Sequence, residues 1–484
     1  MSSDETSERA RKRQKGNDSF NNYRNEYLLT CKWRGLVDAK LSGSAPYHFF
    51  LTGVKELPKS LDEDLTITFP GKCNPFCVVA VSLPPHLELL DKSLGTLEHS
   101  LHVNFMIELP WLLAQYALSD IINPSMTILY GVDDDDLRHP PKHLKLTAIR
   151  VKSPYPFGHH HTKLSIFFYT DKSVRFVVST ANLLESDWEE RTQGVWISPK
   201  CPYLGDDVPI NYGESESFFK ADILQYLNSY RLPQIRDWLV RIQKTDCSEI
   251  KVCFVSSIPG DHGESYGYLK LSKLIKEYAA ESIAHLGNLV VQCSSIGSLG
   301  QSPESWLTGE FGRSLSKCSQ DSSESQVRVI YPSVENVTSS LHGLYGGACL
   351  PYSSGTHKRQ LWLEKYLWQW RSDSRYRSKA VPHIKTYGKM SPDGKEIFWF
   401  LLTSANLSKA AWGKRNKTGG INIMSYEAGV LYLPKLMIGK DVFTIKHGGY
   451  RKPNEEGFPL PYDSPLKLYE SKDEIFLHDR HFPR

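Results

Sequence analysis

The sequence contains one composite motif twice, and this repeat constrains the fold more than any other feature. His161-Thr-Lys163 in the first copy corresponds to His383-Ile-Lys385 in the second, 222 positions later. Each His-x-Lys is followed by an apolar run, by a turn of small residues that ends in Asn182-Leu or Asn406-Leu, and by a Trp. A third His-x-Lys, His143-Leu-Lys145, lacks this context. The shared context predicts two similar halves.

The spacing within each copy has a geometric meaning. Side chains two positions apart on a strand share a face, so each His and Lys should point together. Turn sequences at 169–173 and 391–394 predict hairpins. The return strands, 174–178 and 397–402, would bring Asn182 and Asn406 back beside the His-Lys pairs. We expect each Asn to be the N-cap of a short helix whose free N–H groups face an anion.

Each half therefore offers an imidazole, an ammonium group and an amide donor. Two such sets that face each other would hold a phosphate with a histidine on either side. This arrangement suits in-line displacement, in which one histidine attacks and the opposite one protonates the leaving oxygen. The Lys and Asn donors would stabilise charge on the non-bridging oxygens. The motif predicts an active site at the interface of the halves.

The doubled pattern resembles the phospholipase D superfamily, and within it the tyrosyl-DNA phosphodiesterase branch. The superfamily at large has an Asp five residues after the Lys, where this chain has Phe168 and Met390. The distant Asn takes the place of that Asp, as in the tyrosyl-DNA branch. The resemblance covers about residues 25 to 470. It implies an α/β fold of two similar α/β/α halves with mixed sheets, the duplicated phospholipase D-like fold.

The resemblance also implies roles for residues at matching positions. His161 would be the nucleophile, and His383 would be the general acid and then the general base. Gln193 and Glu427 would orient the two histidines. The phosphate would be bound by four side chains: Lys163, Lys385, Asn182 and Asn406. The DNA strand would be contacted by Phe157, Ser294, Ser295, Gly297, Ser298, Ser408 and Lys409.

The implied function is DNA repair. The enzyme would hydrolyse the 3′-phosphotyrosyl bond between DNA and a topoisomerase I-derived peptide through a covalent phosphohistidine. It would leave a 3′-phosphate end, and other 3′ blocking groups are further candidate substrates. One alternative is another phosphodiesterase of the superfamily, acting on lipids or as a general nuclease. The missing Asp and the lack of a membrane-binding stretch argue against it. A second alternative is an inactive protein that binds DNA ends.

Composition narrows the remaining possibilities. A net charge of +4 over 484 residues requires any nucleic-acid contact to come from a local patch. The nine cysteines show no zinc or disulfide spacing, so we expect free thiols in a reducing compartment. His159, His160 and His161 suggest a metal site, but adjacent strand residues alternate faces. We expect no metal or other cofactor, a monomer, and no signal peptide or membrane span.

We divide the chain into a polar tail (1–24), a first half (25–247) and a second half (248–484). The basic run at 8–15 in the tail indicates nuclear import or a solvated segment, and a DNA substrate favours the nucleus. Apolar spacing predicts helices at 235–242, 271–278 and 363–370, and strands at 251–256 and 327–331. The acidic stretch 133–136 is typical of a solvated turn, with a cation site as the alternative.

Three sequence features leave alternatives open. Basic residues surround Tyr376 in the stretch 371–379, which would either follow a nucleic-acid backbone or form an ordinary charged loop. Phe157 would face a base or sugar, or else belong to the core. The last residues, from Glu474, lack the Trp-rich strand usual in the family. This departure puts stability and the peptide side of the groove in question.

Overall fold

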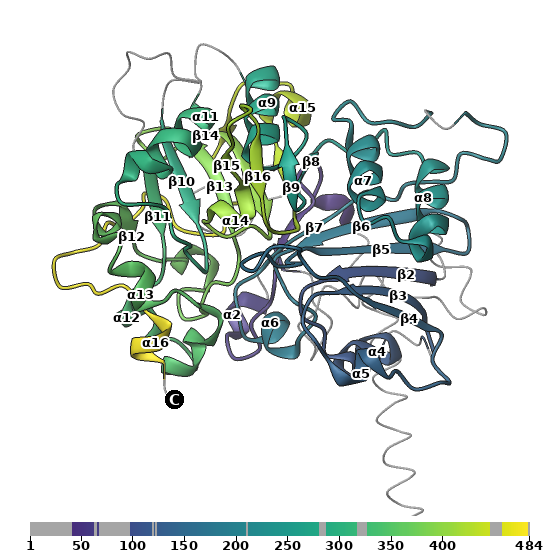
Figure 1. Cartoon of the computed structure of the whole chain (residues 1–484), viewed down its shortest axis with the longest axis horizontal. Coiled ribbons are helices and arrows are strands. Elements are labelled where there is room, and N and C mark those ends of the chain that lie inside the picture. Colours follow the sequence, from purple (N-terminus) through teal and green to yellow (C-terminus); the bar gives the residue numbers. More distant parts are fainter. Residues whose placement is uncertain are drawn as a thin grey trace, which may run out of the picture.

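The computed structural model describes residues 41–482 except 62–64, 67–96, 119–120, 122, 210–211, 280–286, 317–326 and 446–456. The predicted tail, 1–24, and Cys73 and Cys77 lie outside the described residues. The described chain forms two large mixed β-sheets, one from each half, with helices around them (Figure 1). A small third sheet of β15 (Lys414–Arg415), β16 (Ile421–Ile423) and β9 (Gly260–His262) belongs to the second half.

The first sheet has seven strands in the order β1-β7-β6-β5-β2-β3-β4. The strands β2, β3 and β4 are parallel to one another, and every other neighbouring pair is antiparallel. Their bounds are β1 Phe49–Leu51, β2 Leu97–Asn104, β3 Ser125–Tyr130, β4 Leu146–Arg150, β5 Lys163–Tyr169, β6 Val174–Ser179 and β7 Gly194–Ile197.

The second sheet repeats this topology. Its order is β12-β11-β10-β13-β14-β17-β8, with β18 (Phe443–Thr444) beside β14. Here β10, β11 and β12 are parallel and the other pairs along this order are antiparallel. The duplication predicted from the motifs is therefore confirmed strand by strand. The bounds are β8 Cys253–Ser257, β10 Asn288–Gln292, β11 Val327–Ile330, β12 Leu367–Trp368, β13 Thr386–Met390, β14 Glu396–Thr403 and β17 Glu427–Tyr432.

The apolar side chains of the central strands are buried on both faces. In β5, Leu164 and Ile166 belong to a core shared by the two sheets, whereas Phe167 packs on the outer face. Strands buried on both faces read as continuous apolar runs, which explains the sequence after each His-x-Lys. Because one core spans both halves, the boundary near residue 247 separates two topological repeats but not two hydrophobic cores.

The protein has three hydrophobic cores: one shared by the two sheets and one on the outer face of each sheet. Helices complete all three. The outer face of the first sheet packs with α4 (Leu109–Leu118) and α6 (Glu185–Glu189), and that of the second with α9 (Gly267–Tyr278) and α11 (Gly312–Ser316). The shared core also takes in α7 (Phe219–Asn228) and α8 (Arg236–Gln243). The helices predicted at 235–242 and 271–278 and the strands predicted near 251–256 and 327–331 are confirmed.

Two local predictions differ from the structure. The helix predicted at 363–370 is wrong, because a short 3₁₀ turn, Leu361–Tyr366, gives way to β12, which pairs with β11. The acidic stretch 133–136, predicted to be a solvated turn, instead begins a short helix. Asp134 caps the short α5 (Asp135–Arg138) by accepting from the Leu137 N–H, and Asp133 pairs with Arg138 and Arg150.

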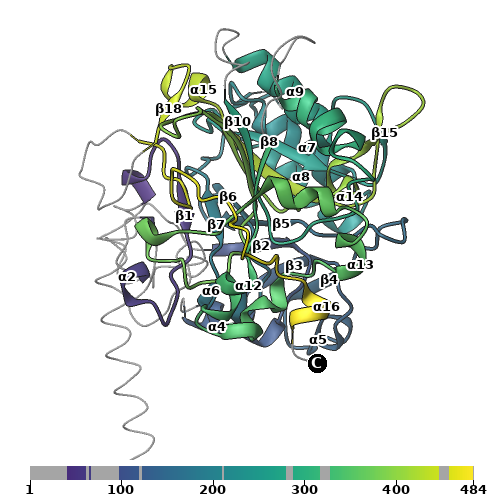
Figure 2. The same cartoon turned by 90° about the vertical axis from the view of Figure 1, so that its left-hand side faces the viewer.

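The divergent C-terminal segment packs into the second half. Ile475, Phe476 and Leu477 are buried, and Ile475 forms a bridge with Ser333. The following short helix, α16 (His478–His481), lies beside α13 (Ser354–His357), where Asp479 accepts from Ser354 (Figure 2). These last residues supply core contacts to the second half.

A buried guanidinium ties the second half to the N-terminal segment. Arg377 is fully buried and donates to the carbonyl oxygens of Thr52, Ser60 and Arg375 and to the Thr66 hydroxyl. The bonds to Thr52, Ser60 and Thr66 cross more than 300 positions of sequence and hold the segment that follows β1.

We expect Arg377→Met to lower the free energy of unfolding by about 2–4 kcal/mol, because each buried acceptor left unsatisfied costs ~1–3 kcal/mol. Urea unfolding monitored by tryptophan fluorescence measures the change. Arg371→Met is the matched control, since Arg371 is exposed and pairs only with exposed Asp373 among the interactions described. Its effect should stay within ~0.5 kcal/mol. Equal effects of the two variants would contradict the structural role of Arg377.

Candidate active site

Each His-x-Lys segment is held by the backbone of the opposite half. The His161 N–H donates to the Tyr426 carbonyl at 3.0 Å, and the Tyr426 N–H donates to the His159 carbonyl at 2.9 Å. In the same way, the His383 N–H donates to the Thr192 carbonyl at 3.0 Å. Both segments lead directly into equivalent strands, β5 and β13, so the two histidines are brought together by reciprocal bridges.

The residues predicted to orient the histidines do contact them across the halves. Glu427 Oε2 lies 3.0 Å from Nδ1 of His161, and Gln193 Nε2 lies 2.9 Å from Nδ1 of His383. The Thr180 hydroxyl donates to Gln193 Oε1 at 2.7 Å, which turns the amide nitrogen toward the ring. Each histidine therefore has its Nδ1 engaged and its Nε2 left for a substrate.

Glu427 fixes the tautomer of His161. A carboxylate only accepts hydrogen bonds, so the neutral His161 ring carries its proton on Nδ1 and a lone pair on Nε2. Although burial opposes it, His161 and the Ser404 hydroxyl hold the pKa of Glu427 below its usual value. Burial and the neighbouring Lys163 lower the pKa of His161 to about 4. His161 is thus uncharged at neutral pH and suited to act as a nucleophile.

The two motif lysines, Lys163 and Lys385, are both buried. Lys163 donates to the His161 carbonyl at 2.8 Å, and Lys385 donates to the His383 carbonyl. Burial lowers the pKa of Lys163 to about 8. Burial and then the charge of Lys163 lower the pKa of Lys385 to about 7. The charge of Lys163 acts on Lys385, and that of Lys385 acts on His161, so both motifs surround a single centre that favours an anion.

The prediction that the two asparagines are N-caps is wrong. The N-cap of α14 (Lys409–Trp412) is Ser408, and α6 follows Leu184, which makes no side-chain cap. Asn406 Oδ1 instead accepts from the N–H groups of Ser294 and Ser295 at 3.1 and 3.0 Å. These two loop N–H groups hold the oxygen of the Asn406 side chain, so it does not cap α14. Among the described residues, the amide nitrogen of Asn406 is left to face a phosphate.

Asn182 has a different partner, which sequence reasoning missed. Its backbone and side-chain N–H groups donate to Asp187 at 2.7 and 2.9 Å. Asp187 Oδ2 also lies 3.3 Å from Nδ1 of His383, and Arg191 pairs with the other oxygen. The sequence does contain a signal for this contact. Asp187 lies five residues after Asn182, whereas the position five residues after Asn406 is Ala411, so the carboxylate is present in one copy of the motif alone.

The residues predicted to contact DNA fall into two places. Ile296 forms a bridge with Leu407, so the segment 294–298 runs beside 406–409, and a Cβ on Gly297 would come within 2.6 Å of Ser408. Within this set, Ser298 is exposed, Ser295, Ser408 and Lys409 are half-buried, and Ser294 is buried behind Asn406. Phe157 is 77% exposed on another loop, which excludes the core alternative.

The three consecutive histidines have different surroundings. The ring of His159 lies near Phe105, whereas His160 is buried with Nε2 2.9 Å from the Tyr230 hydroxyl. Only His161 lies against Glu427. Over the described ranges, no group of three or more His, Cys, Asp or Glu side chains is arranged to hold a metal ion. Among the helices of the described residues, none is long and apolar enough to cross a membrane.

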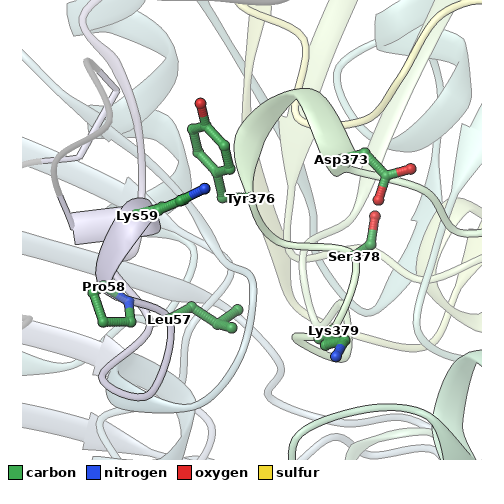
Figure 3. A pocket seen from close by; sticks show the side chains of 7 residues that line it. All are labelled: Leu57, Pro58, Lys59, Asp373, Tyr376, Ser378 and Lys379. Atoms are coloured by element: carbon green, nitrogen blue, oxygen red, sulfur yellow. The ribbon is translucent and has the colours of Figure 1, made fainter.

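The basic stretch 371–379 is used partly inside the protein. Arg375 and Arg377 are buried, whereas Tyr376 and Lys379 line a cavity of about 640 Å³ together with Lys59 (Figure 3). The Lys59 ammonium lies 5.6 Å from the centre of the Tyr376 ring. The remaining lining residues are Leu57, Pro58, Asp373 and Ser378. A contact of this stretch with nucleic acid stays a prediction, now limited to these outward-facing side chains.

Comparison with known proteins agrees with this geometry. The family model described as tyrosyl-DNA phosphodiesterase matches residues 86–470. The chain belongs to the tyrosyl-DNA phosphodiesterase family. It is therefore a phosphodiesterase, and the family likeness predicted from the motifs is confirmed.

Relatives extend over most of the chain. Tyrosyl-DNA phosphodiesterase 1 of Drosophila melanogaster is 40% identical and aligns with 94% of this chain and 77% of its own. The Arabidopsis thaliana enzyme of the same name is 34% identical, over 79% of this chain and 69% of its own. The crystal structure of yeast tyrosyl-DNA phosphodiesterase matches with a TM-score of 0.67 at 21% identity, covering 90% of this chain and 100% of that one, and supports the fold.

We expect anion binding by this family member to take up protons. An anion between Lys163 and Lys385 raises both lowered pKa values, so affinity should fall as pH rises from about 6 to about 9. Titration calorimetry with inorganic sulfate, in buffers of different ionisation heat, measures the uptake. Lys385→Met should reduce it, and Lys395→Met, an exposed lysine, is the control. An affinity independent of pH would contradict the assignment.

Proposed function

We propose that this protein hydrolyses the 3′-phosphodiester bond that joins DNA to a tyrosine of a topoisomerase I-derived peptide, and so repairs blocked DNA ends. One observation carries the proposal. Nδ1 of each histidine is engaged by a side chain of the opposite half, which leaves both Nε2 atoms for one phosphodiester. Family membership supports the choice of a phosphotyrosyl-DNA substrate.

In the first step, Nε2 of His161 attacks phosphorus. The N–P bond forms as the bond from phosphorus to the tyrosyl oxygen breaks, and Nε2–H of protonated His383 gives its proton to that oxygen. The peptide leaves with its tyrosine, and the DNA stays on His161 as a phosphohistidine. Glu427 supports the step because it stabilises the positive charge that develops on the attacking imidazole.

In the second step, His383 acts as a base. Its Nε2 takes a proton from water, the water oxygen attacks phosphorus, and the bond to His161 breaks. The product is a 3′-phosphate end and the enzyme is restored. Protonation and deprotonation by a positioned histidine contribute ~10²–10⁴ in rate in each direction.

The lysines and Asn406 supply the charge stabilisation. Their donors would bind the non-bridging oxygens, where charge increases in the transition state, and the loss of one such donor costs on the order of 10²–10³ in rate. The DNA strand would leave the centre along segments 294–298 and 406–409, with Phe157 against a base or sugar. Other 3′ blocking groups are further proposed substrates, and we propose a nuclear monomer.

The alternatives have less support. A lipid phospholipase or general nuclease of the superfamily would have the Asp that Phe168 and Met390 replace. An inactive DNA-end binding protein would not need both histidines oriented. Turnover measurements distinguish these alternatives from the proposal.

We expect the protein to release tyrosyl peptide from a single-stranded oligonucleotide with a 3′-phosphotyrosyl end in excess chelator, leaving a 3′-phosphate. Gel electrophoresis and mass spectrometry identify both products. Binding without release would favour the inactive protein. Transphosphatidylation of a phospholipid in the presence of an alcohol would favour the lipid enzyme.

We expect the two histidines to separate the steps. His383→Asn should slow the second step most, because no base activates water, and a covalent DNA adduct should accumulate on His161. His161→Ala should form no adduct. Denaturing gels with labelled oligonucleotide detect the adduct, and peptide mapping locates it. An adduct formed by His161→Ala would reverse the assigned roles.

A further inference from the structure

The two copies of the motif differ in where they place a carboxylate. The Thr180 N–H donates to the Gly194 carbonyl, and the Ser404 N–H donates to the Ala428 carbonyl, so these pairs occupy matching places in the two sheets. Gln193 immediately precedes Gly194, and Glu427 immediately precedes Ala428, so Gln193 and Glu427 occupy equivalent positions in the two halves. Each also receives a hydroxyl bond, from Thr180 and Ser404 respectively. One histidine thus faces a carboxylate, and the other faces an amide.

Asp187 supplies a carboxylate on the amide side. It is fully buried, and its Oδ2 lies 3.3 Å from Nδ1 of His383. Arg191 pairs with its Oδ1, and the two N–H groups of Asn182 donate to Oδ2, so the carboxylate is fixed in place. The equivalent position in the second copy is Ala411. Nδ1 of His383 therefore has a donor, Gln193, and an acceptor, Asp187, side by side.

We propose that Asp187 is a positioning residue that stabilises the doubly protonated form of His383, and so makes it the acid for the leaving group. This inference rests on the proposed function. Before substrate binds, neutral His383 carries its proton on Nε2 and accepts from Gln193 at Nδ1. Protonated His383, and the neutral ring left after it gives up the Nε2 proton, donate from Nδ1 to Asp187. Both states have a partner without a flip of the Gln193 amide.

The proton balance follows from this pair. Doubly protonated His383 gives its Nε2 proton to the tyrosyl oxygen. It keeps its Nδ1 proton, which remains hydrogen-bonded to Asp187. The neutral ring that remains has its lone pair on Nε2, which is the form that removes a proton from water in the second step. Uptake of that proton restores the starting state, so Asp187 itself gains and loses no proton.

The surroundings show why His383 needs such a partner. The ring is buried, and Lys385 and Arg191 face it as cations, so burial and these charges lower the pKa of His383 to about 3. Asp187 raises the pKa of His383. It is the negatively charged group among the described residues that act on this ring. The phosphodiester adds a second negative charge when it binds. Loss of Asp187 would remove this offset and leave burial and the two cations opposing protonation of His383 until the substrate binds.

Asp187→Asn tests the proposal with two substrates. The change keeps the shape and an acceptor for Asn182 but removes the charge. One oligonucleotide carries a 3′-phosphotyrosyl group, and the other a 3′-(4-nitrophenyl) phosphate, whose more acidic phenol leaves without help. We expect a loss of roughly 10–100-fold on the tyrosyl substrate, part of the ~10²–10⁴ of general acid catalysis, and at most about 3-fold on the nitrophenyl substrate.

The ratio of the two rates is independent of how much of the variant folds, because one sample serves both substrates. Equal losses would show that Asp187 only supports Asn182, and no loss on either would show that it is dispensable; both outcomes overturn the proposal. Failure of the unaltered protein to cleave either substrate would instead reject the proposed function.

A second variant moves the carboxylate to the position it has in the other copy. In Asp187→Asn/Gln193→Glu, Thr180 would donate to the new carboxylate as Ser404 does to Glu427. We expect this pair of changes to recover at least about 5-fold of the tyrosyl rate lost in Asp187→Asn, and to return the high-pH limb of kcat toward its original position. The single variant should shift that limb to lower pH. An unshifted limb would overturn the proposal.

Discussion

Each of the two motif histidines, His161 and His383, depends on the opposite half of the chain for its backbone position and for its Nδ1 partner. The bridges His160–Tyr426 and Thr192–Pro382 fix the two segments, and Glu427 and Gln193 then fix the rings. A displacement of about 1 Å at a reacting centre can cost ~10²-fold in rate. The hydrophobic core shared by the two sheets therefore matters for the proposed reaction, because it holds the two half-sites relative to each other.

Duplication supplies a symmetric frame for an asymmetric reaction. The two sheets have the same strand order and directions, and they place His161 and His383 at equivalent points. The proposed reaction needs one ring neutral for attack and the other protonated. Equivalent partners would give both rings the same preference. The differences between Gln193 and Glu427, and between Asp187 and Ala411, remove this degeneracy and leave the scaffold unchanged.

The sequence predicted what local patterning controls. Hairpins and central strands follow from the apolar runs, the turn residues and the repeated motif, whereas the two orienting residues, Gln193 and Glu427, were predicted from the family resemblance. It did not predict that Asn182 and Asn406 would be held by Asp187 and by the Ser294–Ser295 backbone, because such bonds depend on which loops meet in space. Residues 363–370 have helical spacing, but pairing with β11 imposed a strand after a short 3₁₀ turn. Tertiary contacts overrode local preference in each case.

Burial gives the site a low charge before substrate arrives. Both imidazoles and both ammonium groups have lowered pKa values, mainly because water is excluded. A phosphodiester anion that enters this region favours protonation of the lysines and of His383, whereas Glu427 keeps the Nε2 lone pair of neutral His161 directed at the substrate. In the proposed mechanism, substrate binding and protonation of the acid, His383, are thereby linked through the same negative charge. The low dielectric that makes isolated charges costly also strengthens each contact with the phosphate.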